Sequence, residues 1–285
     1  MQREYAARGL NNVFNGSMRT LADNRITNLP SLRANISYLL SVEDADIDRI
    51  EVVLGPGSAL YGPNVTNGVT NIITKSPFAS RGTDVSLMAG TQSLLSGSVR
   101  HAGTMGGDFG YRISAGYSSA EDWEFTDPRE PYPDDRTAER WSVDGRLDYA
   151  LGNSSSITVN AGHSTAVRGL DLTDNGAVLA DNFSYSHVQS RFVSGDLFAQ
   201  VYLNMNDAGD TWLLRENQKI VDRSRKIVAE VQHSSSPADW ERLTYGVDMF
   251  LTRPETDGTI MGRNEDRDDV NEFGAYLQSD TRLIG

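Results

Sequence analysis

Residues 47–75 read I-D-R-I-E-V-V-L-G-P-G-S-A-L-Y-G-P-N-V-T-N-G-V-T-N-I-I-T-K, and this stretch decides how the rest of the chain is interpreted. Two apolar, β-branched runs, Ile50 to Leu54 and Val69 to Thr74, flank a segment rich in glycine. Such runs predict short buried strands, and the glycines predict turns or close backbone approaches. The stretch therefore predicts a strand, a tight irregular loop and a second strand.

The same glycines can be tested against two phosphate-binding motifs. A P-loop needs Lys and then Ser or Thr after its second glycine, but Pro63 and Asn64 follow Gly62. A dinucleotide-binding fingerprint needs a third glycine where Leu60 stands, and Pro63 disfavours the helix that should follow. The sequence therefore argues against nucleotide binding.

The stretch resembles the plug domain of TonB-dependent outer-membrane receptors. That family carries a block close to IERIEV, RGPGSALYG and INIITK in succession, and residues 47–75 follow it with substitutions at Leu54, Asn67 and Thr70. The segment Leu21 to Arg25 is similar to a further plug signature, with Asn24 in place of a glycine. The residues that carry the resemblance are Arg8, Gly9, Asp23, Arg49, Glu51, Gly55, Pro56, Gly57, Ser58, Tyr61, Gly62, Gly68, Asn71 and Lys75.

Composition limits the remaining classes of protein. The chain has 285 residues, enough for one large domain or two ordinary ones. Its mean hydropathy is −0.43, and it has no run of 18 apolar residues, so a transmembrane helix is not predicted. A transmembrane β-barrel remains compatible, because its strands alternate apolar and polar residues and are polar on average.

The sequence offers no anchor for catalysis or metal binding. There is no cysteine, and the four histidines are scattered without acidic partners at metal-ligand spacing. Serine-hydrolase and zinc-protease motifs are absent from the sequence. We therefore expect neither an enzyme nor a bound cofactor. The net charge of −13 argues against nucleic acid as a partner.

The charge distribution indicates two domains. Residues 1–80 hold seven basic and seven acidic side chains, whereas residues 81–285 hold 19 basic and 32 acidic ones. We therefore expect a plug domain at 1–80, of α+β type, with partial helix over residues 30–40. Residues 81–285 would form the N-terminal part of an antiparallel transmembrane β-barrel.

The second domain shows repeated two-residue alternation. Tyr111, Ile113 and Ala115, for example, alternate with Arg112 and Ser114. One apolar face per strand is typical of a half-buried antiparallel sheet, and strands of 8 to 11 residues with aromatic ends favour a membrane barrel. We expect about ten strands, near 83–90, 94–102, 109–118, 140–150, 156–163, 184–192, 196–205, 219–233, 241–251 and 270–280.

The expected connections also indicate a barrel. Those after the second, fourth, sixth and eighth strands are short, whereas those after the third, fifth, seventh and ninth are long and polar. Acidic residues concentrate in the long connections at 119–139 and 252–269, which is typical of solvated loops. The alternative is capture of a ligand at the cell surface, with Asp122, Trp123, Glu124 and Tyr132 as the candidate ligand loop.

The resemblance implies a function as well as a fold. In the family, a 22-stranded barrel in the Gram-negative outer membrane holds a plug, and the TonB–ExbB–ExbD complex drives uptake of a scarce small ligand past it. The expected partners are that complex, outer-membrane lipid and the ligand, which the sequence does not specify. Inward charges would then pair with Arg49 and Glu51 of the plug, and the candidates are Arg112, Asp144, Arg146 and Asp148. The alternative is that the inward faces are polar because water reaches them.

The chain is shorter than a complete receptor of this family is expected to be. Ten strands occupy about 200 residues, so 22 strands need on the order of 450, and we expect the chain to be an internal fragment of such a receptor, without its signal peptide and TonB-contact segment. The alternatives are a passive outer-membrane channel or adhesin barrel, and a soluble secreted all-β binding protein. The plug-like block argues against the channel or adhesin. In the soluble protein, residues 47–75 would be an incidental turn, and this alternative stays open.

Overall fold

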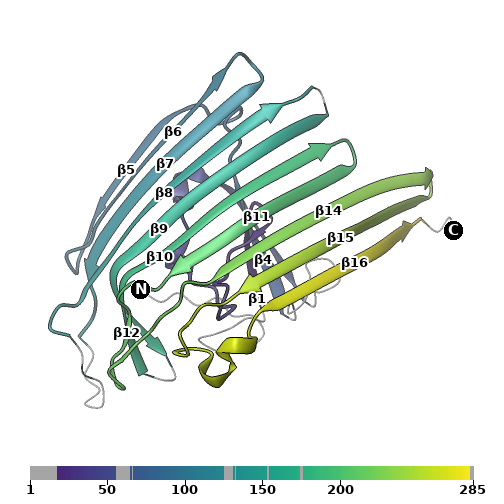
Figure 1. Cartoon of the computed structure of the whole chain (residues 1–285). Helices are drawn as coiled ribbons and strands as arrows, with labels where there is room; N and C mark the ends of the chain where they lie inside the picture. The colour runs from purple at the N-terminus through teal and green to yellow at the C-terminus, as the bar shows by residue number, and fades with distance from the viewer. Residues whose placement is uncertain are drawn as a thin grey trace.

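The chain forms a small mixed sheet enclosed on one side by a large antiparallel sheet (Figure 1). The computed structural model describes residues 18–55, 65, 67–124, 131, 133–152, 154–173 and 176–282. Within these ranges no helix is long and apolar enough to cross a membrane. The helical segments are short 3-10 turns at Ser37–Leu39, Asp44–Asp46 and Gly262–Arg267, so the helix expected over residues 30–40 is limited to one turn.

The small sheet, called here the plug sheet, has the strand order β2-β1-β4-β3. Its strands are β1 (Met18–Ala22), β2 (Arg25–Ile26), β3 (Ile47–Leu54) and β4 (Gly68–Thr74). β1 pairs in parallel with β4 and antiparallel with β2, and β3 pairs antiparallel with β4. The strand–loop–strand reading of residues 47–75 is therefore confirmed for its two strands, β3 and β4.

The expected burial of the first of these strands was wrong. Ile50 and Leu54 of β3 are 54% and 61% exposed, whereas Val69 of β4 is buried. The difference arises because β4 lies between β1 and β3, while β3 is the edge strand with a single neighbour. Apolar β-branched residues favour a strand in either position, so composition alone does not separate an edge from a centre.

The large sheet contains ten long antiparallel strands in chain order, β5 to β11 and β14 to β16. They are β5 (Gly82–Ala89), β6 (Leu95–Met105), β7 (Phe109–Glu121), β8 (Thr137–Ala150), β9 (Ser155–Thr173), β10 (Gly176–Ser194), β11 (Leu197–Asp207), β14 (Arg225–Ala238), β15 (Glu241–Arg253) and β16 (Val270–Thr281). Each overlaps one of the ten expected strands. A short hairpin of β12 (Trp212–Leu213) and β13 (Gln218–Lys219) pairs onto β10.

All the long connections lie at one end of this sheet, together with the short connection 90–94. Residues 106–108, 151–154, 195–196 and 239–240 form the turn end, and the long connections 122–136, 208–224 and 254–269 form the loop end. The expected long loop after the fifth strand was wrong, because β9 and β10 continue to Thr173 and from Gly176. Pairs such as Leu170 with Leu179 and Asp171 with Val178 extend the hairpin, and the interrupted alternation over these residues concealed that extension in the sequence.

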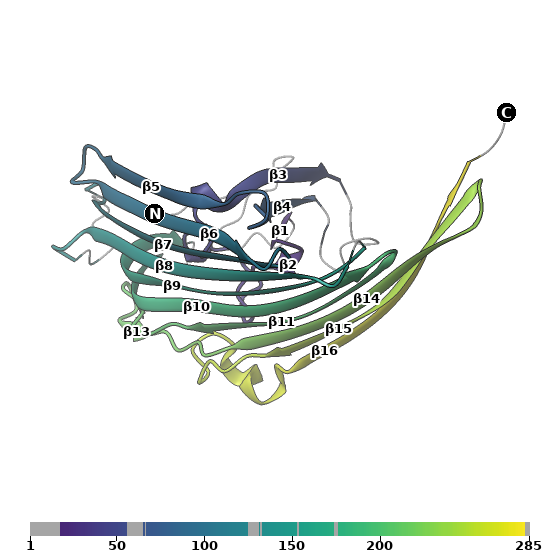
Figure 2. The same ribbon diagram turned by 90° about the horizontal axis from the view of Figure 1, so that it is seen from above.

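The two faces of the large sheet differ in polarity, as the alternation predicted. Ile113 on β7 is 61% exposed, whereas its neighbours Arg112 and Ser114 are almost completely buried. The sheet curves into a trough with the plug sheet on its concave side (Figure 2). Polar side chains therefore face the plug sheet, and the convex face carries an apolar band of the kind that lipid solvates.

Two apolar clusters join the plug sheet to the trough. One contains Leu21, Ile26 and Val69 of the plug sheet with Tyr202, Val228 and other buried residues of the large sheet. The second packs Leu29 and Leu39 against Phe183 and Tyr185 on the long β9–β10 hairpin. Removing apolar surface from water stabilises these contacts by about 25 cal/mol for each Å² buried. The remainder of the interface is polar.

Candidate functional site

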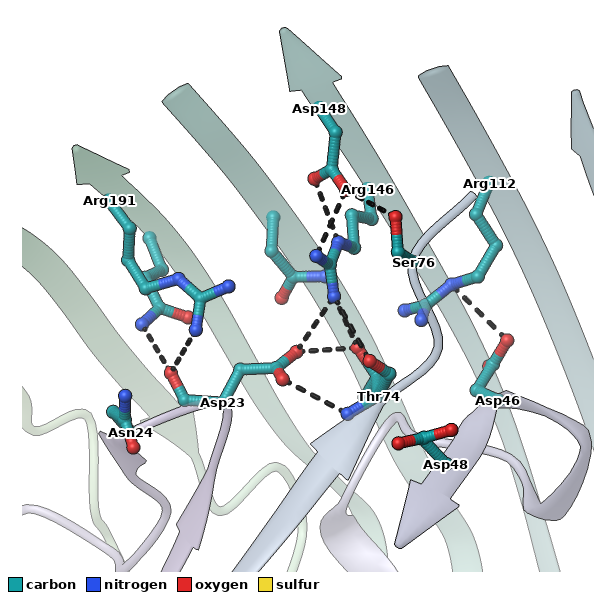
Figure 3. A network of polar contacts seen from close by, with 12 residues as sticks. Asp23, Asn24, Asp46, Asp48, Thr74, Ser76, Arg112, Arg146, Asp148 and Arg191 are labelled. Carbon is teal, nitrogen blue, oxygen red and sulfur yellow. Dashed lines mark hydrogen bonds and ion pairs between the residues drawn. The ribbon is translucent and has the colours of Figure 1, made fainter. Parts of the chain in front are cut away.

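The candidate site is the polar interface between the plug sheet and the concave face of the large sheet (Figure 3). Its side chains come from the turns at the ends of β1, β3 and β4 and from inward positions on β6 to β11. Alternation along each strand places every second side chain inward, and these inward residues include arginines, aspartates and amides. Buried polar groups require partners, and here those partners lie across the interface.

Asp46 joins two arginines of the large sheet. It lies in the 3-10 turn that leads into β3 and is completely buried. Its Oδ1 lies 3.2 Å from Nε of Arg100 and 3.2 Å from Nε of Arg112, and it accepts a hydrogen bond from Ser114 Oγ at 2.8 Å. The carboxylate thus compensates two guanidinium charges that would otherwise be buried with less opposite charge nearby.

Asp144 on β8 continues this network. Arg112 Nη2 donates to Asp144 Oδ1 at 2.5 Å, and Asn160 Nδ2 donates to the same oxygen at 3.0 Å. Its other oxygen accepts from Ser41 Oγ of the plug at 2.9 Å. Arg112 therefore bridges a carboxylate of the plug and a carboxylate of the large sheet.

A second network surrounds the turn between β1 and β2. Asp23 and Asn24 both have positive φ, at 48° and 67°, as a two-residue type I′ hairpin requires. The Asp23 carboxylate accepts from the backbone N of Thr74 at 3.0 Å and from its Oγ1 at 2.6 Å. Arg146 Nη1 donates to Thr74 Oγ1 at 2.9 Å and lies 3.6 Å from Asp23 Oδ2. The turn thus links β1, β4 and β8.

Two amide side chains and one guanidinium group of the large sheet donate hydrogen bonds to the backbone of the same turn. Gln189 Nε2 and Arg191 Nη1 donate to the Asp23 carbonyl oxygen at 3.0 and 3.2 Å (Figure 3). Gln200 Nε2 donates to the Asn24 carbonyl oxygen at 3.3 Å. These contacts fix the position of the turn without depending on the identity of its side chains.

Charged groups also hold the flanks of the plug sheet. Arg25 Nη1 donates to Tyr185 Oη and to Asn204 Oδ1, both at 3.1 Å. On the opposite flank, Glu43 accepts from Ser142 Oγ at 2.5 Å and from Arg140 Nη2 at 3.4 Å. The polar interface therefore extends from β6 to β11.

The expected pairing of Arg49 and Glu51 with the large sheet was wrong. Arg49 Nε donates to Glu51 Oε1 at 2.8 Å and its Nη1 donates to Asp48 Oδ2 at 2.9 Å, all within β3. These three side chains are exposed because β3 is an edge strand. The inward charges of the large sheet do contact the plug, but through Asp46, Asp23, Ser41 and Thr74.

Several other predicted plug residues have defined places. Gly55 has a φ of 117°, a conformation that favours glycine. A Cβ on Gly68 would clash with the Val53 carbonyl oxygen. Asn71 Nδ2 donates to Asn24 Oδ1 at 2.9 Å, and Lys75 Nζ donates to the Ala45 carbonyl oxygen at 2.9 Å. The predicted residues Arg8, Gly9, Pro56, Gly57, Ser58, Tyr61 and Gly62 lie outside the described residues.

The candidate ligand loop lies at the loop end, between β7 and β8. Trp123 is 77% exposed, and Asp122 Oδ1 accepts from the Trp123 backbone N at 2.8 Å. Glu124 Oε2 lies 3.9 Å from Arg136 Nη1. Tyr132 lies outside the described residues. A role of this loop in binding stays a prediction.

The residues that sequence reasoning missed are Ser41, Glu43 and Asp46 of the plug and Arg100 on β6. The three plug residues stand in the segment S-V-E-D-A-D at 41–46, directly before β3, and Arg100 stands in the alternating pattern of β6. The sequence signal that could have identified Arg100 was its inward position in the alternating pattern of β6. Among the described residues, no group of three or more His, Cys, Asp or Glu side chains is placed to hold a metal ion.

Comparisons with known proteins agree with this geometry. Residues 1–69 match the family model of the TonB-dependent Receptor Plug Domain. The chain is 39% identical over 84 residues to the vitamin B12 transporter BtuB of Vibrio vulnificus, which covers 29% of this chain and 14% of that protein. It is 28% identical over 167 residues to the metal-pseudopaline receptor CntO of Pseudomonas aeruginosa, covering 56% of this chain and 21% of that protein.

Solved structures show the same fold. The FrpB iron transporter of Neisseria meningitidis superposes with a TM-score of 0.69 at 15% identity, covering 95% of this chain and 50% of that one. The ferric enterobactin receptor PfeA of Pseudomonas aeruginosa superposes with a TM-score of 0.61 at 16% identity, covering 84% and 42%. The chain thus spans about half the length of the solved receptors it matches.

The fold, the polar interface and these matches define a class of protein. The chain carries a plug domain of the TonB-dependent receptor family, followed by ten antiparallel strands that match the barrels of TonB-dependent transporters over about half their length.

Proposed function

We propose that this chain is part of a receptor for energised uptake of a scarce small ligand across the outer membrane. The observation that supports this function best is the polar interface between the plug sheet and the trough. Residues 1–80 would act as the movable plug and residues 81–285 as the wall around it. The TonB–ExbB–ExbD complex would supply the force, and outer-membrane lipid would cover the convex face.

The chemistry of the interface suits reversible movement. Its buried ion pairs and hydrogen bonds fix one orientation, since a displaced guanidinium or carboxylate loses its partner. Water that enters between the two surfaces can satisfy the same groups, so separation does not leave an apolar surface exposed along the whole interface. A fully apolar interface of equal size would resist such wetting.

A disulfide across the interface tests whether the plug must move. The ideal Cβ position on Gly116 of β7 lies 2.3 Å from the carboxylate carbon of Glu43, so cysteines at both positions would place two thiols close to each other. The natural chain has no cysteine, so this pair has no competing thiol within residues 1–285. The test uses Glu43→Cys with Gly116→Cys in the receptor as its cell makes it.

The oxidised double variant is expected to bind ligand but to lose energised uptake, and reduction should restore uptake. Each single cysteine variant serves as a control, because it disturbs the site without a covalent link. Uptake by the oxidised variant at the rate of the reduced one would contradict a moving plug. Uptake that persists after collapse of the proton gradient would instead support a passive channel.

A further inference from the structure

A small hollow on the concave face of the large sheet receives the side chain of Glu43. Gly116 on β7 lies opposite Ser142 on β8, and Arg140 is the next inward residue of β8 toward the loop end. Gly116 is buried, and a Cβ placed on it would lie 2.3 Å from both Cδ and Oε1 of Glu43. The carboxylate therefore occupies the space that a side chain at position 116 would fill. We call Gly116, Arg140 and Ser142 the carboxylate hollow.

The carboxylate hollow supplies the donors that a carboxylate requires. Ser142 Oγ donates to Oε1 of Glu43 at 2.5 Å, and Arg140 Nη2 donates to the same oxygen at 3.4 Å. The side chains of Glu43 and Arg140 are only 14% and 18% exposed, so both charges have left most of their water. A hydroxyl and a guanidinium together bind a carboxylate through charge-assisted hydrogen bonds.

The carboxylate that Arg140 contacts comes from the plug alone. Among the residues that the structure describes, Arg140 forms an ion pair with Glu43 and with no acid of the large sheet. Three other inward arginines that contact the plug each keep an ion pair within the large sheet: Arg100 with Asp84, Arg112 with Asp144, and Arg146 with Asp148. Removal of the plug would therefore leave Arg140, unlike these three, without a carboxylate.

Arg140 also has donor capacity that the plug does not use. Its Nη2 donates to the Leu40 carbonyl oxygen at 3.0 Å, and this acceptor carries no net charge. Its Nε is buried and has no hydrogen-bond partner within the described part of the chain. Buried guanidinium groups normally have their donors satisfied and their charge compensated. The hollow is thus built around a cation that needs an anionic occupant.

We propose that the carboxylate hollow is a binding site for carboxylates in general, and that the plug occupies it with its own Glu43. The role of the site in a working receptor rests on the proposed function, since movement of the plug would withdraw Glu43 and free the hollow for another carboxylate. That second carboxylate would compensate Arg140 and so lower the cost of the movement. Binding itself depends only on the hollow.

Acetate tests the site directly, because Glu43→Ala removes the atoms of an acetate ion from the side chain. The receptor is used as its cell makes it, purified in detergent, and amide hydrogen exchange over residues 39–47 measures how firmly this segment is held. We expect Glu43→Ala to accelerate that exchange roughly ten-fold, because Arg140 loses its carboxylate. Sodium acetate at about 100 mM and neutral pH should reverse most of the change, since a single small carboxylate binds weakly.

Two solutes serve as controls for acetate. Acetamide has the same shape and no charge, so it should not compensate Arg140 and should leave the exchange fast. Sodium chloride at the concentration of the acetate matches its ionic strength without offering a carboxylate. Equal slowing of exchange by acetate and by either control would mean that the hollow does not recognise a carboxylate.

Second-site variants in the Glu43→Ala receptor locate the rescue. Arg140→Met removes the cation, and Gly116→Ala fills the hollow with a methyl group, so each should abolish the effect of acetate. Gly145→Ala on β8 is the matched control for the glycine change, because its added Cβ would meet the Ala161 carbonyl oxygen at 3.9 Å. Acetate should still slow exchange in that control.

Glu43→Gly provides a second cavity that is one carbon larger. Propionate should slow exchange more than acetate in Glu43→Gly, whereas acetate should be the better of the two in Glu43→Ala. This reversal of preference follows the shape of the cavity, so a general loss of stability in either variant would not produce it. The same preference in both variants would contradict binding in the hollow.

The outcomes separate the site from the uptake function. Unchanged exchange in Glu43→Ala, failure of acetate to slow it, or an acetate effect that survives Arg140→Met would overturn the proposed site. If acetate fails while the disulfide between positions 43 and 116 blocks energised uptake, the proposed function stands without the site. If acetate acts as expected and the disulfide leaves uptake unchanged, the site stands and the moving plug fails.

Discussion

At the scale of single residues, the interface depends on buried carboxylates that each contact several partners. Asp46 is the clearest case, because it is completely buried and faces two arginines of the large sheet. Asp48, two residues further on, is exposed, and its carboxylate forms an ion pair with Arg49 on its own strand. The two aspartates form a natural pair for comparison.

We predict that Asp46→Asn weakens plug docking by roughly 3 kcal/mol, since it leaves two buried guanidinium groups without their shared carboxylate. Hydrogen exchange of the β3 and β4 amides in the assembled receptor measures the loss. Asp48→Asn should change the same exchange by less than about 0.5 kcal/mol. Equal protection in both variants would show that the buried carboxylate does not hold the plug.

Sequence reasoning succeeded at residues whose conformation is set locally. Asn24 was expected to replace a turn glycine, and its φ of 67° confirms this. It failed for Arg49 and Glu51, whose partners depend on which strand lies at the sheet edge. That position is set by the pairing of β4 with β1, over a separation of about 50 residues, and no local pattern encodes it.

At the scale of elements, alternation located all ten long strands but not their ends. β7 and β8 remain paired as far as Glu121 and Thr137, beyond the ends expected for those strands. β9 and β10 extend much further, past the residues of the second apolar cluster. A strand that projects beyond a membrane band loses the apolar alternation that membrane contact requires, so its last residues resemble a loop in sequence.

The β7–β8 connection tests whether acidic loops contribute to binding. Replacing residues 122–136 by Asn-Gly keeps the pair Glu121 and Thr137 and closes the hairpin with a two-residue type I′ turn. This change removes the whole candidate ligand loop, and we predict a several-fold lower ligand affinity with normal assembly. Heat-modifiable migration of the receptor checks assembly, and equilibrium binding checks affinity. Unchanged affinity would assign the loop to solvated surface.

At the scale of the whole molecule, the large sheet has two edges and one apolar outer face. Its strand order runs from β16 to β5, and these two end strands pair on one side only within the described residues. Leu87 on β5 and Phe273 on β16 are among its most exposed apolar side chains. The count of 22 strands for the complete receptor stays a prediction.

We predict that the 285-residue chain, expressed alone, associates in water and becomes dispersed in detergent. Unpaired edges template further strand pairing, and the outer apolar band has no lipid to cover it. Size-exclusion chromatography with light scattering, with and without detergent, measures the difference. A monomer in plain buffer that unfolds in one cooperative transition would contradict the assignment of the convex face to lipid.

The parallel pairing of β1 with β4 has a mechanical consequence. Met18 at the start of β1 pairs with Gly68, and the pairs continue in register to Ala22 and Ile72. A force applied to Met18 along the strand axis acts on the hydrogen bonds of all these pairs at once. A force applied across the axis breaks the hydrogen bonds one pair after another, starting at Met18. The direction of the pull, and not only its strength, therefore determines the load at which the plug sheet opens.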